Sequence, residues 1–189
     1  MLKITYKEDK GIKFGKWSDK ISKLIYFDSV NEILSKINTN GLVADYGGAN
    51  GILKQFIPNI ISIDIDASKV PDIIDNIITH KGNYNLIIIR FVLHYLNDYE
   101  VLQLFENIKS YHKGKILIIQ FCNNDLKSKY KNSLNEFKYF RTENQLENLL
   151  PKFKKIYNIE YNIDKKFYLN RLGNGNYIKH KEQLNAYLI

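Results

Sequence analysis

The sequence predicts one doubly wound α/β domain, and three observations support this fold class. Between residues 42 and 57 an apolar, strand-like segment runs into a glycine turn and then into helical spacing. The near-continuous apolar runs LIIIR and KILIIQF are typical of central parallel strands that are buried on both faces. The chain has 189 residues and is 44% hydrophobic, so it can bury one core of ordinary size, and no linker or repeat divides it.

The residues before the first strand are expected to form a helical arm, so we divide the chain into an arm at 1–40 and a ligand-binding domain at 41–189. Ser29 and Glu32 have the spacing of a capping box. The helix that they would begin carries an apolar stripe that is expected to pack on the first strand: Val30, Ile33, Leu34 and Ile37.

The segment VADYGGANG, residues 43–51, contains the most informative motif of the chain. Its strand ends on a carboxylate, Asp45, and the turn that follows contains Gly47, Gly48 and Gly51. Glycine leaves the backbone without side-chain walls, so a ligand can approach it closely. The order strand, glycine turn, helix start predicts a ligand at the helix N-terminus and at the carboxyl edge of a sheet.

Two other glycine-turn chemistries fit this segment poorly. A phosphate-binding P-loop needs a Lys followed by Ser or Thr at the end of the turn, whereas Gly51 is followed by Ile52, Leu53 and then Lys54. A dinucleotide fingerprint needs glycines at relative positions one, three and six, and no start position in the segment satisfies that spacing.

The segment resembles motif I of the class I S-adenosylmethionine-dependent methyltransferases, in which an acidic residue precedes a spaced glycine turn. Ala49 stands where that pattern has its middle glycine, and Gly48 beside it keeps the turn permissive. The resemblance runs from about Gly41 to the C-terminus. It implies a seven-stranded, mostly parallel sheet with an antiparallel C-terminal strand, and S-adenosylmethionine as cofactor. It also implies that the cofactor lies against Asp45, Tyr46, Gly47, Gly48 and Gly51.

The second predicted strand, IISID, ends on Asp64 at about the place where this family binds the cofactor's ribose. A carboxylate can accept hydrogen bonds from both ribose hydroxyls, and Ile65 beside it is a further expected cofactor contact. The alternative is that Asp64 only caps the following turn, a function for which Asp66 is the better candidate.

Two further segments extend the resemblance to the adenine and methionine ends of the cofactor. In the family an acidic side chain after the third strand accepts from the adenine amino group, which here implies Asp75 and Asn76, although Asp before Asn is also an ordinary turn former. The fourth strand ends at Arg90, which we expect to contact the cofactor or, alternatively, the substrate.

Candidate catalytic and substrate residues lie beyond the fourth strand and near the N-terminus. His94 is placed where a general base could reach a substrate hydroxyl, with a packing function as the alternative. Tyr95 is an expected substrate contact. Trp17 belongs to an N-terminal segment that in similar enzymes folds over the cofactor as a lid, but it could equally anchor the arm to the surface.

The C-terminal part of the chain predicts one more helix and a final pair of strands. Thr142 and Gln145 form a capping box ahead of a leucine stripe that Pro151 ends. Residues 155–163 and 177–189 are expected to pair in an antiparallel manner, joined through Gly173 and Gly175.

Composition excludes several classes of protein. No apolar stretch reaches the roughly 20 residues of a membrane span, so a cytoplasmic protein is expected. The single cysteine, Cys122, excludes an internal disulfide, and the four His are too scattered to predict a metal site. Cys122 also lacks the proline-containing motif that accompanies the nucleophilic cysteine of RNA pyrimidine C5 methyltransferases. It is expected to be a small buried residue.

The resemblance implies a methyltransferase, which we expect to act on oxygen or nitrogen of a small-molecule acceptor. The formal charge of +8 comes almost entirely from Lys and keeps RNA methylation open as an alternative. A subunit that binds S-adenosylmethionine without catalysis is the alternative from another class. The sequence does not indicate the acceptor, the use of a general base or the oligomeric state.

Overall fold

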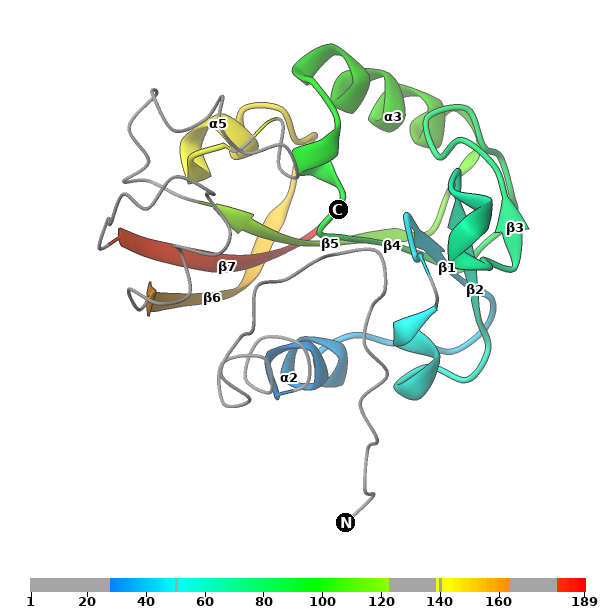
Figure 1. Cartoon of the computed structure of the whole chain (residues 1–189), viewed down its shortest axis with the longest axis horizontal. Coiled ribbons are helices and arrows are strands. Elements are labelled where there is room, and N and C mark those ends of the chain that lie inside the picture. Colours follow the sequence, from blue (N-terminus) through cyan, green and yellow to red (C-terminus); the bar gives the residue numbers. More distant parts are fainter. Residues whose placement is uncertain (1–27, 50, 123–138, 140, 164–179) are drawn as a thin grey trace.

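The computed structural model describes residues 28–49, 51–122, 139, 141–163 and 180–189. Within these residues seven strands form one sheet, in the order β3, β2, β1, β4, β5, β7, β6 (Figure 1). The strands β1 to β5 pair in parallel, and β7 runs antiparallel to both of its neighbours. The prediction of a doubly wound, mostly parallel sheet with an antiparallel C-terminal strand is confirmed. The strand bounds are β1 Val43–Tyr46, β2 Ile60–Asp64, β3 Ile73–Ile74, β4 Leu86–Arg90, β5 Lys115–Cys122, β6 Lys154–Ile163 and β7 His180–Leu188.

The strand order reverses at β1, which lies between β2 and β4. The chain proceeds from β1 to β2 and β3 on one side, and then crosses back to β4 and β5 on the other. Because the three central strands are parallel, their carboxyl ends meet at one edge, at Tyr46, Asp64 and Arg90. In open sheets of this kind, ligands bind beyond the carboxyl ends of the strands at such a reversal.

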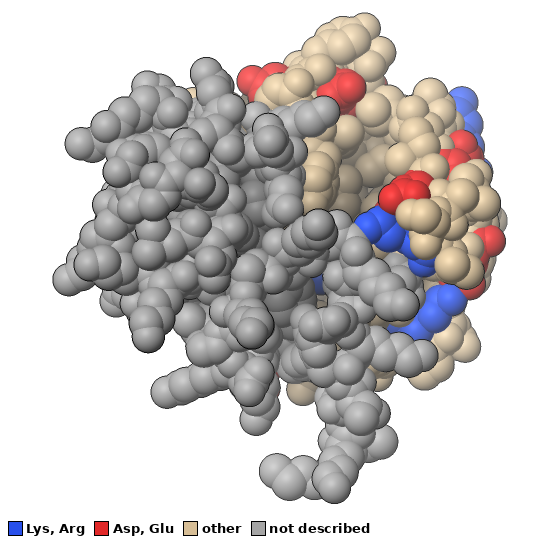
Figure 2. Space-filling view, viewed as in Figure 1, with Lys and Arg blue, Asp and Glu red and all other residues tan. Residues whose placement is uncertain are grey.

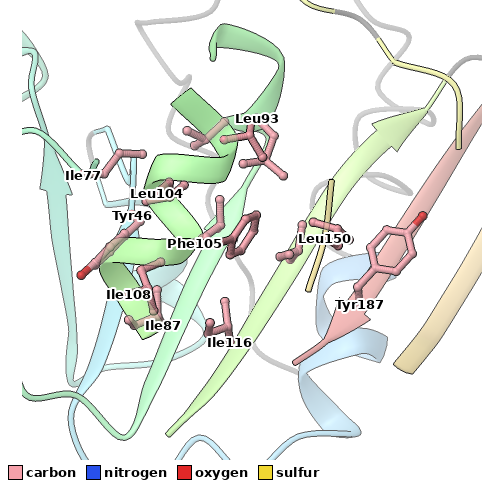
Figure 3. Packing of buried hydrophobic residues seen from close by; sticks show 14 of the residues in the cluster. Tyr46, Ile77, Ile87, Leu93, Leu104, Phe105, Ile108, Ile116, Leu150 and Tyr187 are labelled. Atoms are coloured by element: carbon pink, nitrogen blue, oxygen red, sulfur yellow. The ribbon is translucent and has the colours of Figure 1, made fainter. Parts of the chain in front are cut away.

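Helices cover both faces of the sheet (Figure 1), and each face has its own apolar core. The helix α2, Ser29–Ser35, packs on one face with the 3₁₀ helix η2, Ile52–Gln55. The other face carries α3, Asp98–Tyr111, and α5, Glu143–Glu147. Figure 3 shows Leu104, Phe105 and Ile108 of this second core. Every residue of β4 is buried, as a strand covered on both faces requires.

Within the described residues two helix starts have capping boxes, of which the sequence predicted one. Thr142 accepts from the backbone N–H of Gln145, whose side chain accepts in return, which confirms the prediction for α5. A second box, between Asn97 and Glu100, begins α3 directly after the short 3₁₀ helix η4, Leu93–Tyr95. The second box fixes where the chain turns away from the carboxyl edge of the sheet.

The capping box predicted at Ser29 and Glu32 is wrong. The residue before the helix is Asp28, and no side chain caps the first turn. Ser29 is already helical and buried, and its Oγ accepts from the hydroxyl of Tyr157, 3.1 Å away on β6. Glu32 pairs with Lys36 one turn later, at 3.0 Å. A partner 128 residues away therefore takes the hydroxyl that the local pattern assigned to the cap.

The remaining predictions about the ends of the chain have different outcomes. The antiparallel pairing of β6 with β7 is confirmed. The predicted connection through Gly173 and Gly175 and the predicted lid residue Trp17 lie outside the described residues, and the division at residue 40 stays a prediction. Among the helices that the structure describes, none is long and apolar enough to cross a membrane.

Candidate functional site

A cavity of about 500 Å³ opens at the carboxyl ends of β1, β2 and β4. It lies where the strand order reverses, and its volume is within the range of roughly 300–1,000 Å³ that small-molecule sites occupy. Its walls come from the glycine turn, the ends of β2 and β4 and the loops that follow them. The lining residues are Gly47, Ala49, Asp64, Ile65, Asp66, Lys69, Asn76, Ile77, Ile78, Arg90, Phe91, Val92, Tyr95, Leu96 and Glu100.

Gly47 is the position at which the turn requires glycine. Its φ is +72°, and a Cβ built there would lie 2.4 Å from Cγ2 of Val92, on the loop after β4. Its N–H donates to the carbonyl of Ile63 at 2.7 Å, which ties the turn to β2. The bare backbone of Gly47 therefore forms part of the cavity wall, close to the opposite loop.

Ala49 adopts a glycine-like conformation although it carries a methyl group. Its φ is +46°, in the left-handed region that costs a side-chain-bearing residue roughly 1–2 kcal/mol. Its N–H donates to Oδ2 of Asp64 at 3.0 Å. The departure from the glycine pattern thus keeps the turn conformation, and the Ala49 N–H adds a further hydrogen bond between the turn and β2.

The Asp64 carboxylate is held in place by backbone donors and still has free acceptor capacity. Oδ2 accepts from Ala49, and Oδ1 accepts from the N–H of Asp66 at 2.9 Å. An ionised carboxylate offers about four acceptor sites, so about two remain for a ligand. Asp66 is the residue that caps the next turn, accepting from Ser68 and beginning the 3₁₀ helix η3, Ala67–Lys69, as predicted.

Three predicted cofactor residues of the first strand and turn do not line the cavity. Asp45 is 1% exposed and lies behind the turn, where a Cβ on Gly48 would come within 2.8 Å of its carbonyl oxygen. Tyr46 points into the core beside α3 (Figure 3), and its hydroxyl lies 2.6 Å from that of Tyr111. Burial raises the pKa of Tyr46 well above its ordinary value. These residues shape the turn from behind, and their direct contact with the cofactor stays a prediction.

Gly51 also lies outside the cavity wall. Its φ is +70°, and it precedes the first residue of η2. Its N–H donates to the carbonyl of Gly48 at 2.8 Å, which closes the turn on itself. Gly51 therefore serves the geometry of the turn.

The acid predicted to bind adenine has a partner within the protein. Oδ2 of Asp75 lies 2.7 Å from Nδ1 of His80, and His80 Nε2 lies 2.9 Å from the hydroxyl of Tyr84. The hydrogen bonds from His80 and from the N–H of Asn76 hold the pKa of Asp75 below its ordinary value. Asp75 does not line the cavity, whereas Asn76 and Ile77 do. Of the two residues predicted to bind adenine, Asn76 therefore faces the cavity and Asp75 does not.

The residues predicted beyond β4 have separate positions. Arg90 and Tyr95 both line the cavity, and Tyr95 is 40% exposed. His94 does not line it: the ring is 3% exposed, and the amide of Gln120 donates to its Nδ1 at 2.9 Å. With Nδ1 occupied as an acceptor, the neutral ring carries its proton on Nε2 and is unsuited to remove one there. This arrangement does not favour His94 as a general base, and its catalytic function stays a prediction.

Arg141 is a buried residue of the site that the sequence analysis missed. Its guanidinium donates to the carbonyls of Leu93 at 2.6 Å and Leu96 at 2.8 Å, and to Oδ1 of Asp98 at 2.7 and 2.9 Å. It therefore holds the loop that carries Tyr95 and Leu96 into the cavity wall. One signal was present, because Arg is rare in a chain whose positive charge is almost all Lys.

Cys122 is expected to be unreactive while the protein is folded. The thiol is fully buried at the end of β5, and burial raises its pKa to about 12, so almost none of it is the reactive thiolate near neutral pH. We expect labelling by iodoacetamide at pH 8 to be at least about tenfold slower in buffer than in denaturant. Because the chain has one cysteine, mass spectrometry gives this rate directly. Rapid labelling of the folded protein would contradict the burial.

The fold and the cavity together define a class of protein, the Rossmann-like α/β proteins with a ligand site at the carboxyl edge of the sheet. The sequence profile of the methyltransferase domain family matches residues 18–154. The chain belongs to this family, which confirms its resemblance to the class I methyltransferases, whose cofactor is S-adenosylmethionine.

Solved structures of methyltransferases share the fold at low sequence identity. TehB from Haemophilus influenzae aligns with a TM-score of 0.59 and 19% identity over 89% of this chain and 65% of its own, so the chain spans less than two thirds of TehB. Magnesium protoporphyrin IX methyltransferase from Synechocystis PCC 6803, with bound S-adenosylhomocysteine, aligns with a TM-score of 0.62 and 14% identity. The alignment covers 89% of this chain and 84% of that one. Geranyl diphosphate C-methyltransferase from Streptomyces coelicolor A3(2) aligns with a TM-score of 0.60 and 11% identity, over 85% of this chain and 75% of its own. No curated protein sequence matches the chain.

Proposed function

We propose that this protein transfers the methyl group of S-adenosylmethionine to oxygen or nitrogen of a small-molecule acceptor. The observation that carries the proposal is the Asp64 carboxylate, which lines the cavity at the end of β2 with both oxygens oriented by backbone N–H groups. A carboxylate that is already oriented in this way can accept hydrogen bonds from two neighbouring ribose hydroxyls without a further entropy cost for ordering its side chain.

The rest of the cavity fits the other two parts of the cofactor. Gly47 lets the backbone of the turn pack closely against Val92, and both residues line the part of the cavity to which we assign the methionine end. Asn76, Ile77 and Ile78 line the part of the cavity to which we assign the adenine. The domain at 41–189 thus provides the cofactor site.

Few catalytic groups are needed from the chain. The bound cofactor supplies a sulfonium methyl group that is already activated for transfer. The protein then has to align an acceptor atom in line with sulfur and methyl, and to exclude water. We assign Tyr95 to the acceptor side of the cavity, because it lines the wall beyond β4 and remains partly exposed. An amine acceptor requires no dedicated base, which agrees with the burial of His94.

A small molecule is favoured over RNA by the charges around the cavity. On the described part of the face in Figure 2, basic and acidic side chains are interspersed. The cavity itself combines Lys69 and Arg90 with three acids, Asp64, Asp66 and Glu100. Nucleic-acid sites instead gather basic side chains along one surface to neutralise phosphates.

Replacing Asp64 tests the proposed function directly. We expect Asp64→Ala to weaken binding of S-adenosylmethionine and S-adenosylhomocysteine about tenfold or more, because one or two charge-assisted hydrogen bonds are lost. Isothermal titration calorimetry measures both affinities. Asp64→Asn keeps one acceptor oxygen and should lose less affinity than Asp64→Ala.

The matched control is Glu106→Ala, which removes an exposed acid of α3 that does not line the cavity. It should bind both compounds as the wild type does. Wild-type affinity in a folded Asp64→Ala variant would remove the ribose assignment. Failure of the wild type to bind either compound would remove the proposed function.

A further inference from the structure

Arg90 lines the cavity, and no acidic side chain among the described residues pairs with its charge. It ends β4, is 8% exposed and lines the cavity. Its Nε is buried and has no hydrogen-bond partner. The guanidinium lies over the ring of Phe91, whose centroid is 5.2 Å from the guanidinium carbon. A ring face attracts the charge of a guanidinium but accepts none of its in-plane N–H groups.

The other charged residues on the cavity wall all have partners. Asp64 accepts from two backbone N–H groups, and Glu100 accepts from the N–H of Asn97 at 2.7 Å. Asp66 accepts from Ser68, and Lys69 lies 4.0 Å from Asp66. Arg90 differs from all four, so its charge is not explained by the packing of the wall.

Burying an arginine without an anion is costly, because the guanidinium stays protonated and loses its water. Such a residue is retained where a ligand provides the missing acceptors. We propose that Arg90 binds a carboxylate or a similar oxyanion inside the cavity. Its planar fork of N–H donors suits two oxygens of one anionic group.

The position of Arg90 indicates two sources for that oxyanion. β4 pairs with β1 in a register that sets Ile89 beside Tyr46, so Arg90 lies next to the Gly47 turn. If the proposed function is right, the methionine carboxylate of the cofactor lies at this turn. An anionic group on the acceptor is the second source, because the loop after Arg90 carries Tyr95 on the acceptor side. Either one would also offset the repulsion between the guanidinium and the cofactor's sulfonium.

Two ligands that differ in the amino-acid part separate these sources. S-adenosylhomocysteine carries the carboxylate, whereas 5′-methylthioadenosine keeps the nucleoside and the thioether without it. If Arg90 holds the cofactor's carboxylate, we expect Arg90→Met to weaken the binding of S-adenosylhomocysteine roughly 10- to 100-fold, as measured by calorimetry. The affinity for 5′-methylthioadenosine should not change. Arg90→Lys keeps the charge and should recover part of the affinity.

The second source has its own measurement, with benzoate as a probe anion. Benzoate is titrated by NMR into protein saturated with S-adenosylhomocysteine. Benzoate binding that Arg90→Met abolishes, with the affinity for S-adenosylhomocysteine unchanged, assigns Arg90 to an anionic acceptor. Lys109→Met is the matched control, because it removes an exposed positive charge of α3 that lies off the cavity wall, and it should alter neither measurement.

Other results overturn the proposal. If Arg90→Met weakened the binding of S-adenosylhomocysteine and of 5′-methylthioadenosine equally, Arg90 would act only on the shape of the cavity. Unchanged binding of all probes in a folded Arg90→Met variant would mean that it binds no anion. If the wild type binds neither nucleoside, the proposed function fails by itself. Benzoate titrated into the ligand-free wild type and into Arg90→Met then decides on the anion site alone, which a lack of Arg90-dependent binding would refute.

Discussion

Replacing Arg141 with glutamine is expected to lower the free energy of unfolding by about 3 kcal/mol. The guanidinium is 7% exposed and donates to two carbonyls of the loop after β4 and to Asp98. Glutamine cannot reach all of these acceptors, so the carbonyls of Leu93 and Leu96 lose charge-assisted hydrogen bonds in a largely buried setting. Chemical denaturation monitored by circular dichroism measures the change.

The same substitution is expected to weaken cofactor binding. Leu96 and its neighbour Tyr95 line the cavity, and their loop is no longer held against the sheet. The affinity for S-adenosylhomocysteine should fall at a temperature at which the variant is still folded.

The partner of Arg141 provides the control. The Asp98 side chain is 72% exposed, so Asp98→Asn should cost less than about 1 kcal/mol, as surface ion pairs usually do. Equal losses for Asp98→Asn and Arg141→Gln would show that the ion pair, and not the bonding to the loop carbonyls, stabilises this region.

Replacing Gly47 with alanine is expected to destabilise the protein by about 2–4 kcal/mol, since two costs add. An L-residue at φ +72° is strained, and the new Cβ would lie 2.4 Å from Cγ2 of Val92, a β-branched side chain with little rotamer freedom. Because both residues line the cavity, the change should also abolish measurable binding of S-adenosylhomocysteine.

A second variant separates the two costs. Gly47→Ala combined with Val92→Ala removes the clash but keeps the backbone strain, so part of the stability should return relative to the two single variants. Gly41→Ala is the control outside the cavity: its φ is +87° and its Cβ would meet the side chain of Asn85, so it should lose stability and retain cofactor affinity. Wild-type affinity in Gly47→Ala would show that the ligand does not use this turn.

The predictions that the structure confirms depend on residues close together in the chain. The burial of β4 follows from an unbroken apolar run, and the cap of α5 from the spacing of Thr142 and Gln145. The position of Asp64 at the cavity follows from the glycine turn and the next strand, which lie 15 residues apart and pair directly. Such patterns repeat with the period of a strand or a helix, so they are visible in the sequence.

The side-chain positions that the sequence did not indicate depend on partners that the local pattern does not contain. Ser29 has the spacing of a cap but bonds to Tyr157, and His94 has the position of a base but is buried against Gln120. Tyr46 stands in the motif, yet it packs under α3 with Tyr111. In each case the neighbour that decided the orientation of the side chain is between 26 and 128 residues away.

The amino-acid pattern was thus sufficient for the α/β fold, the ligand edge of the sheet and the acid that lines it, because the order of parallel strands brings their carboxyl ends together whatever the loops do. Which side chains face the cavity was decided by tertiary packing. Each polar side chain near the edge bonds to a partner that the folded chain brings within reach. The spacing of residues in the sequence does not indicate which distant residue that partner will be. Arg141 shows this most clearly, since it holds a loop 45 to 48 residues earlier in the chain.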